Sequence, residues 1–224
     1  MDIKKFKTDE KEITLYQTDS ENSPLVVFNN HTENGNTIMK ALCDMKVPDI
    51  NLLCISNLNW DHDLSPWHCP PIYKNDFPFT GGADEYLKLL LSEILPRTME
   101  LIKDKPSRIC IAGYSLAGLF SLYALYKCDV FDRAASISGS LWFPEFKEYV
   151  LENPMKHQPD KIYLSLGDKE SRTRHPILQT VQENTEIIAK HYRGLNIDAS
   201  FELNPGNHFK DAEIRSAKGI MAIV

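Results

Sequence analysis

Residues 108–118 read Arg-Ile-Cys-Ile-Ala-Gly-Tyr-Ser-Leu-Ala-Gly, a short apolar run followed at once by a helix-forming stretch. This order is typical of a nucleophile elbow, a sharp strand-to-helix turn that exposes one hydroxyl, here that of Ser115. Gly113 leaves room in the turn, and the N–H of Leu116 begins the expected helix and is free to point at an oxyanion. The common pattern is G-x-S-x-G, whereas here Ala117 stands two residues after the serine and Gly118 follows it. The stretch predicts acyl transfer through a serine.

The rest of the chain supplies the strands and helices that such an elbow requires. Residues 11–18 alternate polar and apolar side chains and predict an edge strand. Short continuous apolar runs, typical of strands buried on both faces, occur at 25–28, 52–55, 109–112, 134–137, 162–166 and 199–203. Helical patterns occur between or after them at 83–103, 115–127, 176–191 and 214–224, with Pro96 expected to kink or interrupt the first.

Buried strands that alternate with helices predict an α/β fold with a mostly parallel central sheet and helices on both faces. No repeat, low-complexity segment or linker divides the chain, so residues 1–224 are predicted to form one domain. The long irregular stretch 57–82 is rich in Pro, Asp, Trp and Asn, and loops of this length are usually functional. Few residues remain beyond these elements, so no separate lid domain is expected.

Composition limits the classes of function. The chain has 224 residues, 42% of them hydrophobic, and a net charge of −6, which argues against nucleic acid and against a polybasic membrane patch. No apolar run is long enough to cross a bilayer, and the N-terminus lacks the features of a signal peptide. The five cysteines form no C-x-x-C pair and predict buried, reduced thiols in a cytoplasmic protein. Oligomeric state is not readable.

A nucleophilic serine needs a base and an orienting acid, and in this fold they follow it in the order acid, then histidine. His208 comes directly after the strand at 199–203, on a Pro-Gly turn, and is the best base among seven histidines. Asp168 and Glu170 both follow the strand at 162–166. Either carboxylate can reach the same loop, and the residues alone leave the choice open.

The remaining site residues are expected on neighbouring loops. The second oxyanion donor should be a backbone N–H around Asn30 or His31, in the loop 29–32 that follows the first buried strand. Aromatic side chains near strand ends predict pocket walls; the candidates are Trp60, Trp67 and Tyr73 from the 57–82 loop, and Trp142. Arg172 and Arg174, just past the acid, are candidates for binding an anionic substrate.

Four motifs in this order resemble the putative-esterase (esterase D-like) family of α/β hydrolases: residues 113–118, Ser-Gly-Ser-Leu-Trp at 138–142, Gly167-x-x-Glu170 and Gly206-x-His208. Within that family the chain looks most like the enterochelin (siderophore) esterase type. The resemblance covers roughly residues 25–215. It implies an α/β-hydrolase fold, a Ser–acid–His hydrolase of carboxylic esters or thioesters, and no metal or organic cofactor. Its G-x-x-E pattern favours Glu170 as the acid, with Asp168 as the alternative.

The resulting hypothesis is an esterase that acts on a small-molecule ester through an acyl-enzyme, with Ser115 as nucleophile and His208 as base. An acyltransferase on the same triad is one alternative, since it differs only in accepting an alcohol in place of water. A non-catalytic binding module of the hydrolase fold is another, supported by Ala117 alone. The acyl and alcohol parts of the substrate are not specified by the sequence.

Overall fold

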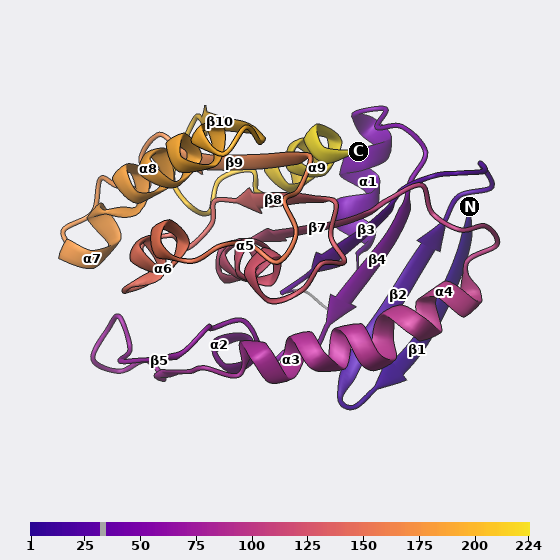
Figure 1. The fold of residues 1–224 in the computed structure, drawn as a ribbon, viewed down its shortest axis with the longest axis horizontal. Helices are drawn as coiled ribbons and strands as arrows, with labels where there is room; N and C mark the ends of the chain where they lie inside the picture. The colour runs from indigo at the N-terminus through magenta and orange to yellow at the C-terminus, as the bar shows by residue number, and fades with distance from the viewer. Residues whose placement is uncertain (32–34) are drawn as a thin grey trace.

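The computed structural model describes residues 1–31 and 35–224 and is built on one eight-stranded sheet (Figure 1). The strand order is β1-β2-β4-β3-β7-β8-β9-β10. Only β2 runs against its neighbours; the other described strands of this sheet share one direction. The strands are β1 (Asp2–Thr8), β2 (Lys11–Gln17), β3 (Leu25–Asn29), β4 (Asn51–Ser56), β7 (Ile109–Tyr114), β8 (Arg133–Ile137), β9 (Lys161–Gly167) and β10 (Asp198–Asn204). The expected mostly parallel sheet is confirmed.

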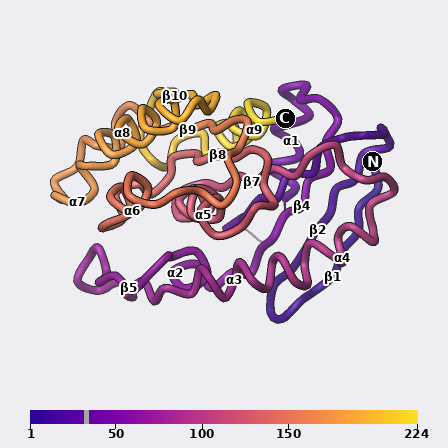
Figure 2. Tube along the Cα trace, in the orientation of Figure 1, coloured from indigo at the N-terminus to yellow at the C-terminus, as the bar shows by residue number. Residues whose placement is uncertain are grey.

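Helices cover both faces of the sheet and create two apolar cores. On one face α1 (Asn36–Asp44) and α9 (Ala212–Ile223) pack together over β3, β7 and β8, around Phe28, Ile137 and Ile220. The other face carries the remaining helices, and α5 packs there against β7 and β8. Those helices are α2 (Trp60–Asp63), α3 (Ala83–Leu89), α4 (Leu95–Leu101), α5 (Leu116–Lys127), α6 (Phe146–Glu152), α7 (Pro176–Gln179) and α8 (Val181–Gly194). The tube in Figure 2 follows the chain from β1 to the final helix.

The prediction that residues 11–18 form the edge strand is wrong. β2 pairs with β4 on one side and with β1 on the other, in register from Asp2–Gln17 to Thr8–Lys11. β1 was missed because its lysine-rich sequence lacks the apolar content of a buried strand. Charged side chains of this kind are typical of a sheet edge, where they discourage further strand pairing.

The helix predicted at 83–103 is one nearly continuous rod, and Pro96 does not break it. α3 passes into a π-helical segment, η1 (Leu90–Ile94), and then into α4, which carries Pro96 in its first turn. A proline has no N–H to donate to the preceding turn, and a π-bulge is a common way to adjust the hydrogen-bond ladder locally. The predicted helix at 176–191 is instead split into α7 and α8 at Thr180.

The irregular stretch 57–82 lies over the carboxyl ends of the parallel strands, as Figure 1 shows on the left of the view. It contains α2 and a small antiparallel pair of strands with two residues each, β5 (His68–Cys69) and β6 (Phe79–Thr80). Trp67 anchors it: its indole N–H donates to the Pro144 carbonyl at 3.1 Å, and its ring contacts Phe143 and Tyr149. Within the described residues, none of the helices combines the length and apolarity required to cross a bilayer.

Candidate active site

Ser115 lies at the sharp turn between β7 and α5, in a backbone conformation that side chains rarely adopt. Its φ is 59° and its ψ is −123°. The strain is held by hydrogen bonds on both sides: the Ser115 N–H donates to the Ile137 carbonyl at 3.0 Å, and the Ser115 carbonyl accepts from the Ser140 N–H at 3.0 Å. Such geometry is typical of a nucleophile elbow, because it lifts the hydroxyl out of the backbone.

The departure at Ala117 is accommodated by Gly113. Ala117 is fully buried, and a Cβ on residue 113 would overlap its carbonyl and its methyl group. Gly118 also faces this contact, because a Cβ there would lie 2.9 Å from the Gly113 carbonyl oxygen. The close approach of helix and strand therefore depends on glycines at 113 and 118, which leaves space for one methyl group at 117.

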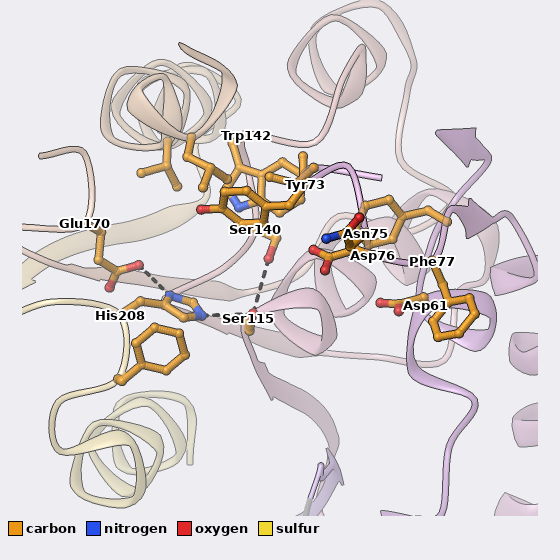
Figure 3. Close-up of a pocket in the computed structure, with 15 residues that line it drawn as sticks. Asp61, Tyr73, Asn75, Asp76, Phe77, Ser115, Ser140, Trp142, Glu170 and His208 are labelled. Carbon is orange, nitrogen blue, oxygen red and sulfur yellow. Dashed lines mark hydrogen bonds and ion pairs between the residues drawn. The ribbon is translucent and has the colours of Figure 1, made fainter. Parts of the chain in front are cut away.

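His208 and Glu170 approach Ser115 from the ends of two adjacent parallel strands, β10 and β9 (Figure 3). The Ser115 hydroxyl lies 3.0 Å from Nε2 of His208, and Nδ1 of His208 lies 2.7 Å from Oε2 of Glu170. The histidine side chain is 28% exposed and the glutamate 5%. The three side chains form one continuous hydrogen-bonded chain from a partly exposed hydroxyl to a buried carboxylate.

Asp168, the alternative acid, contacts the backbone instead. Its Oδ1 accepts from the Gly206 N–H at 2.8 Å, and its own N–H donates to the Asn204 carbonyl at 2.8 Å. These bonds join the loop after β9 to the turn that carries His208. Of the two carboxylates, Glu170 therefore faces the imidazole, and Asp168 fastens the turn.

Arg215, at the start of α9, was missed by sequence reasoning. Its side chain is 2% exposed, and one guanidinium nitrogen contacts Oε1 of Glu170 at 2.5 Å and also donates to the Ser138 hydroxyl. The other terminal nitrogen donates to the carbonyls of Asn207 at 2.9 Å and Lys210 at 3.2 Å, on either side of His208. The only sequence cue is a single arginine seven residues after the predicted base.

The environment of Glu170 keeps it ionised. Burial by itself raises the pKa of Glu170, but the hydrogen bonds and charge of His208, the Gly167 N–H and Arg215 outweigh it and lower the pKa below the ordinary value. A carboxylate that stays charged can fix the tautomer of His208 and stabilise its cation.

The backbone N–H groups predicted to bind the oxyanion differ in their hydrogen bonding. Leu116 is the first residue of α5, so its N–H has no partner within the helix and lies next to the Ser115 hydroxyl. Of the two residues expected for the second donor, Asn30 already donates its N–H to the Ile55 carbonyl at 2.8 Å, within the sheet. His31 lines a cavity together with Ser115. Thr32, at the end of the predicted loop, lies outside the described residues.

Two cavities open on either side of Ser115, and both are lined by Ser115, His208 and Phe209. The first has a volume of about 490 Å³ and the second about 340 Å³. Trp142 lines the first and Trp60 the second, where its ring contacts His31 with centroids 4.9 Å apart.

Three predicted pocket residues lie elsewhere. Trp67 packs among Tyr123, Phe143 and Tyr149 and lines neither cavity, because its ring is used to anchor the 57–82 loop. Arg172 and Arg174 are exposed and also line neither cavity. Within residues 1–31 and 35–224, no group of three or more His, Cys, Asp or Glu side chains is arranged to hold a metal ion.

The family described as "Putative esterase" matches residues 15–209, most of the chain. The chain belongs to this family. It is thus a carboxylic ester hydrolase with the α/β-hydrolase fold. It is also 25% identical over 210 residues to the uncharacterized protein YbbA of Bacillus subtilis (strain 168), covering 87% of this chain and 83% of that one.

Solved structures with the same fold include several esterases of low sequence identity. An IroE-like serine hydrolase from Shewanella oneidensis has a TM-score of 0.81 at 18% identity, over 98% of this chain and 78% of that one. The siderophore hydrolase EstB from Aspergillus nidulans has a TM-score of 0.77 at 19% identity, over 97% and 93%. The enterobactin esterase FES from Shigella flexneri has a TM-score of 0.68 at 17% identity, over 94% of this chain and 54% of that one.

Proposed function

We propose that this esterase cleaves its ester, or thioester, through an acyl-enzyme on Ser115, with His208 as base and Glu170 as the orienting acid. The observation that carries the proposal is the hydrogen-bonded chain of these three side chains, with separations of 3.0 Å and 2.7 Å. The lowered pKa of the Glu170 carboxyl supports it, because a triad acid must remain charged beside the imidazole.

In the first half-reaction His208 Nε2 takes the Ser115 proton as the hydroxyl oxygen attacks the ester carbonyl. The tetrahedral intermediate collapses, the bond to the alcohol oxygen breaks, and His208 returns the proton to that oxygen. In the second half-reaction His208 takes a proton from water, whose oxygen attacks the acyl-enzyme. The acid product then leaves and Ser115 regains its proton.

The oxyanion would be held by backbone donors on either side of the serine. The Leu116 N–H at the start of α5 is the first, favoured by its position at a helix N-terminus. We assign the second to the His31 N–H, because the neighbouring Asn30 N–H is bound to Ile55. Backbone donors need no particular side chain, so this loop does not need the glycine-rich pattern of other esterases.

The substrate is a small-molecule ester with two substituents large enough to use both cavities. Cleavage of a siderophore ester is one candidate, since two similar structures are described as siderophore hydrolases. A cytoplasmic location stays a prediction. All five cysteines are free, and four are buried as predicted, whereas Cys43, near the end of α1, is exposed.

Covalent labelling tests the nucleophile directly. A fluorophosphonate should modify Ser115, identified by mass spectrometry of the labelled peptide, because only an activated serine reacts. Ser115→Ala should abolish labelling and lower kcat/KM for p-nitrophenyl butyrate by about 10³-fold or more. Ser140→Ala is the matched control, since its hydroxyl lies 3.3 Å from that of Ser115 but contacts no imidazole. Labelling that survives in Ser115→Ala, or is lost only in Ser140→Ala, would refute the assignment.

Product analysis with the wild-type protein distinguishes hydrolysis from acyl transfer. With p-nitrophenyl butyrate and an added alcohol, an esterase should release mainly free butyrate, and an acyltransferase mainly the new ester. Failure to label at all would favour the binding-module alternative.

A further inference from the structure

The first cavity beside Ser115 has an aromatic wall that faces solvent. Among the exposed large hydrophobic side chains of the described residues, the aromatic ones are Tyr73, Phe77 and Phe209, exposed by 54%, 82% and 85%. All three line this cavity, and so does Trp142. Exposed rings gathered at one concave site indicate a surface used for binding.

The charged side chains that line this cavity are acidic. Asp61 and Asp76 line the cavity, and Figure 3 shows both carboxylates directed toward the space in front of Ser115. Glu170 also reaches the cavity, but its oxygens are engaged by His208 and Arg215. No lysine or arginine is among the described residues that line it.

Within α2, Asp61 lacks the ion pair that the neighbouring Asp63 forms. Asp63, on the same helix, is buried, forms an ion pair with Lys11 at 2.8 Å and accepts the Asn59 N–H at 2.8 Å. Asp61 is half-buried and has no ion pair with a lysine or arginine of the described chain. Burial raises the pKa of Asp61, the Asp76 carboxylate raises it further, and the charge of His31 opposes both effects. Placing two carboxylates together without a cation costs free energy that a positively charged ligand would recover.

We propose that this cavity binds an ammonium-bearing part of the ester substrate, so that the enzyme prefers a cationic ester to its neutral isostere. The faces of Tyr73, Phe77 and Trp142 would surround the methyl or methylene groups next to the nitrogen, as aromatic rings do for quaternary ammonium ligands. Asp61 and Asp76 would supply the opposite charge. The inference rests on the proposed function, since it assumes that the ester bond lies at Ser115.

The test uses two pairs of esters. Within each pair the two esters differ in one atom, which is a quaternary nitrogen in the cation and a quaternary carbon in its neutral isostere. The alcohol-side pair is butyrylcholine and 3,3-dimethylbutyl butyrate. The acyl-side pair is p-nitrophenyl 4-(trimethylammonio)butanoate and p-nitrophenyl 5,5-dimethylhexanoate. For one of the two pairs, wild-type kcat/KM should favour the cation by about ten-fold more than the D61N/D76N variant does. The ratio of kcat/KM for the cation to kcat/KM for the neutral ester is compared between the two proteins. This comparison removes any difference in intrinsic reactivity between the two esters.

D104N/D129N is the matched control, because it removes the same net charge from exposed sites outside the cavity. It should retain the wild-type ratio, whereas a long-range effect of net charge would lower the ratio in both variants and overturn the proposal. Unchanged ratios in D61N/D76N for both pairs would also overturn it.

A binding measurement keeps this inference separate from the catalytic proposal. Phenyltrimethylammonium binding, followed by NMR titration, should weaken by about ten-fold in D61N/D76N and remain unchanged in D104N/D129N and in Ser115→Ala. Equal binding to D61N/D76N and wild type would refute the inference. Hydrolysis of the neutral esters without any cation preference would refute the inference alone, and lack of hydrolysis together with lack of fluorophosphonate labelling would refute the proposed function.

Discussion

The loops after β7, β9 and β10 differ from the 57–82 loop in how they are held. Hydrogen bonds from strand ends and from buried Arg215 fix Ser115, Glu170 and His208. The 57–82 loop is anchored through the ring of Trp67, while Tyr73 and Phe77 beyond that anchor remain exposed. The difference indicates that the position of the reacting groups is set by the sheet, whereas part of the first cavity is lined by a loop that is anchored separately.

The two carboxylates after β9 give the sharpest test of the first region. Glu170→Gln should lower kcat/KM by about 10³-fold, because the amide can no longer stabilise the His208 cation. Asp168→Asn should change it less than about three-fold, because the remaining amide oxygen can still accept the Gly206 N–H. Steady-state kinetics with one p-nitrophenyl ester measures both. A larger loss in Asp168→Asn would exchange the two roles.

Arg215 is expected to have the next largest effect, as a positioning residue. Arg215→Met should lower kcat/KM by about 10- to 100-fold, because it leaves a buried carboxylate and two carbonyls near His208 without their partner. Arg215→Lys should recover part of this loss, since it restores the charge but not the several bonds of the planar group.

The pH dependence of stability distinguishes this role of Arg215 from simple packing. The folded pKa of Glu170 is lowered from its ordinary value of 4.5, so its stabilisation is present above that pH and is lost as the pH falls through the folded pKa. In Arg215→Met the folded pKa should be higher, so the stabilisation lost on acidification should be smaller and its loss should end at higher pH. Urea unfolding between pH 3 and 7 measures this shift, and parallel curves for wild type and variant would contradict it.

The smallest effects on activity are expected in the 57–82 loop, where the effects on stability and on binding should fall on different residues. Trp67→Ala should lower the free energy of unfolding by about 3 kcal/mol, because it removes a ring packed against several others. Phe77→Ala should change stability by less than about 0.5 kcal/mol and raise KM a few-fold, because its ring is 82% exposed at the cavity. Chemical denaturation and steady-state kinetics on both variants test this contrast, which fails if Phe77→Ala is the more destabilised.

Much of the fold was predictable because it depends on local patterns. The apolar runs located the parallel strands within about two residues, and Gly113-x-Ser115 located the elbow. The edge strand was misplaced because residues 2–8 are rich in lysine, and an edge strand needs no apolar pattern. The effect of Pro96 was overestimated because the preceding π-helical segment absorbs it.

The site was predictable in part for the same reason. His208 and the acidic pair could be placed because each follows a strand, but the pattern could not show which carboxylate faces the imidazole. It could not show that the Asn30 N–H is used by Ile55, that Trp67 packs against the core, or that Arg172 and Arg174 line neither cavity.

By itself the sequence determined the alternation of strand and helix, the elbow at Ser115 and the order of serine, acid and histidine. These features follow from neighbouring residues, because backbone sterics and hydrophobic periodicity act over a few positions. Tertiary structure alone decided that Glu170 contacts His208, that Arg215 joins them, and that Asp61 and Asp76 share a cavity with exposed aromatic rings. Those contacts join residues far apart in the chain, and their partners are chosen by the register of the sheet and the packing of its loops.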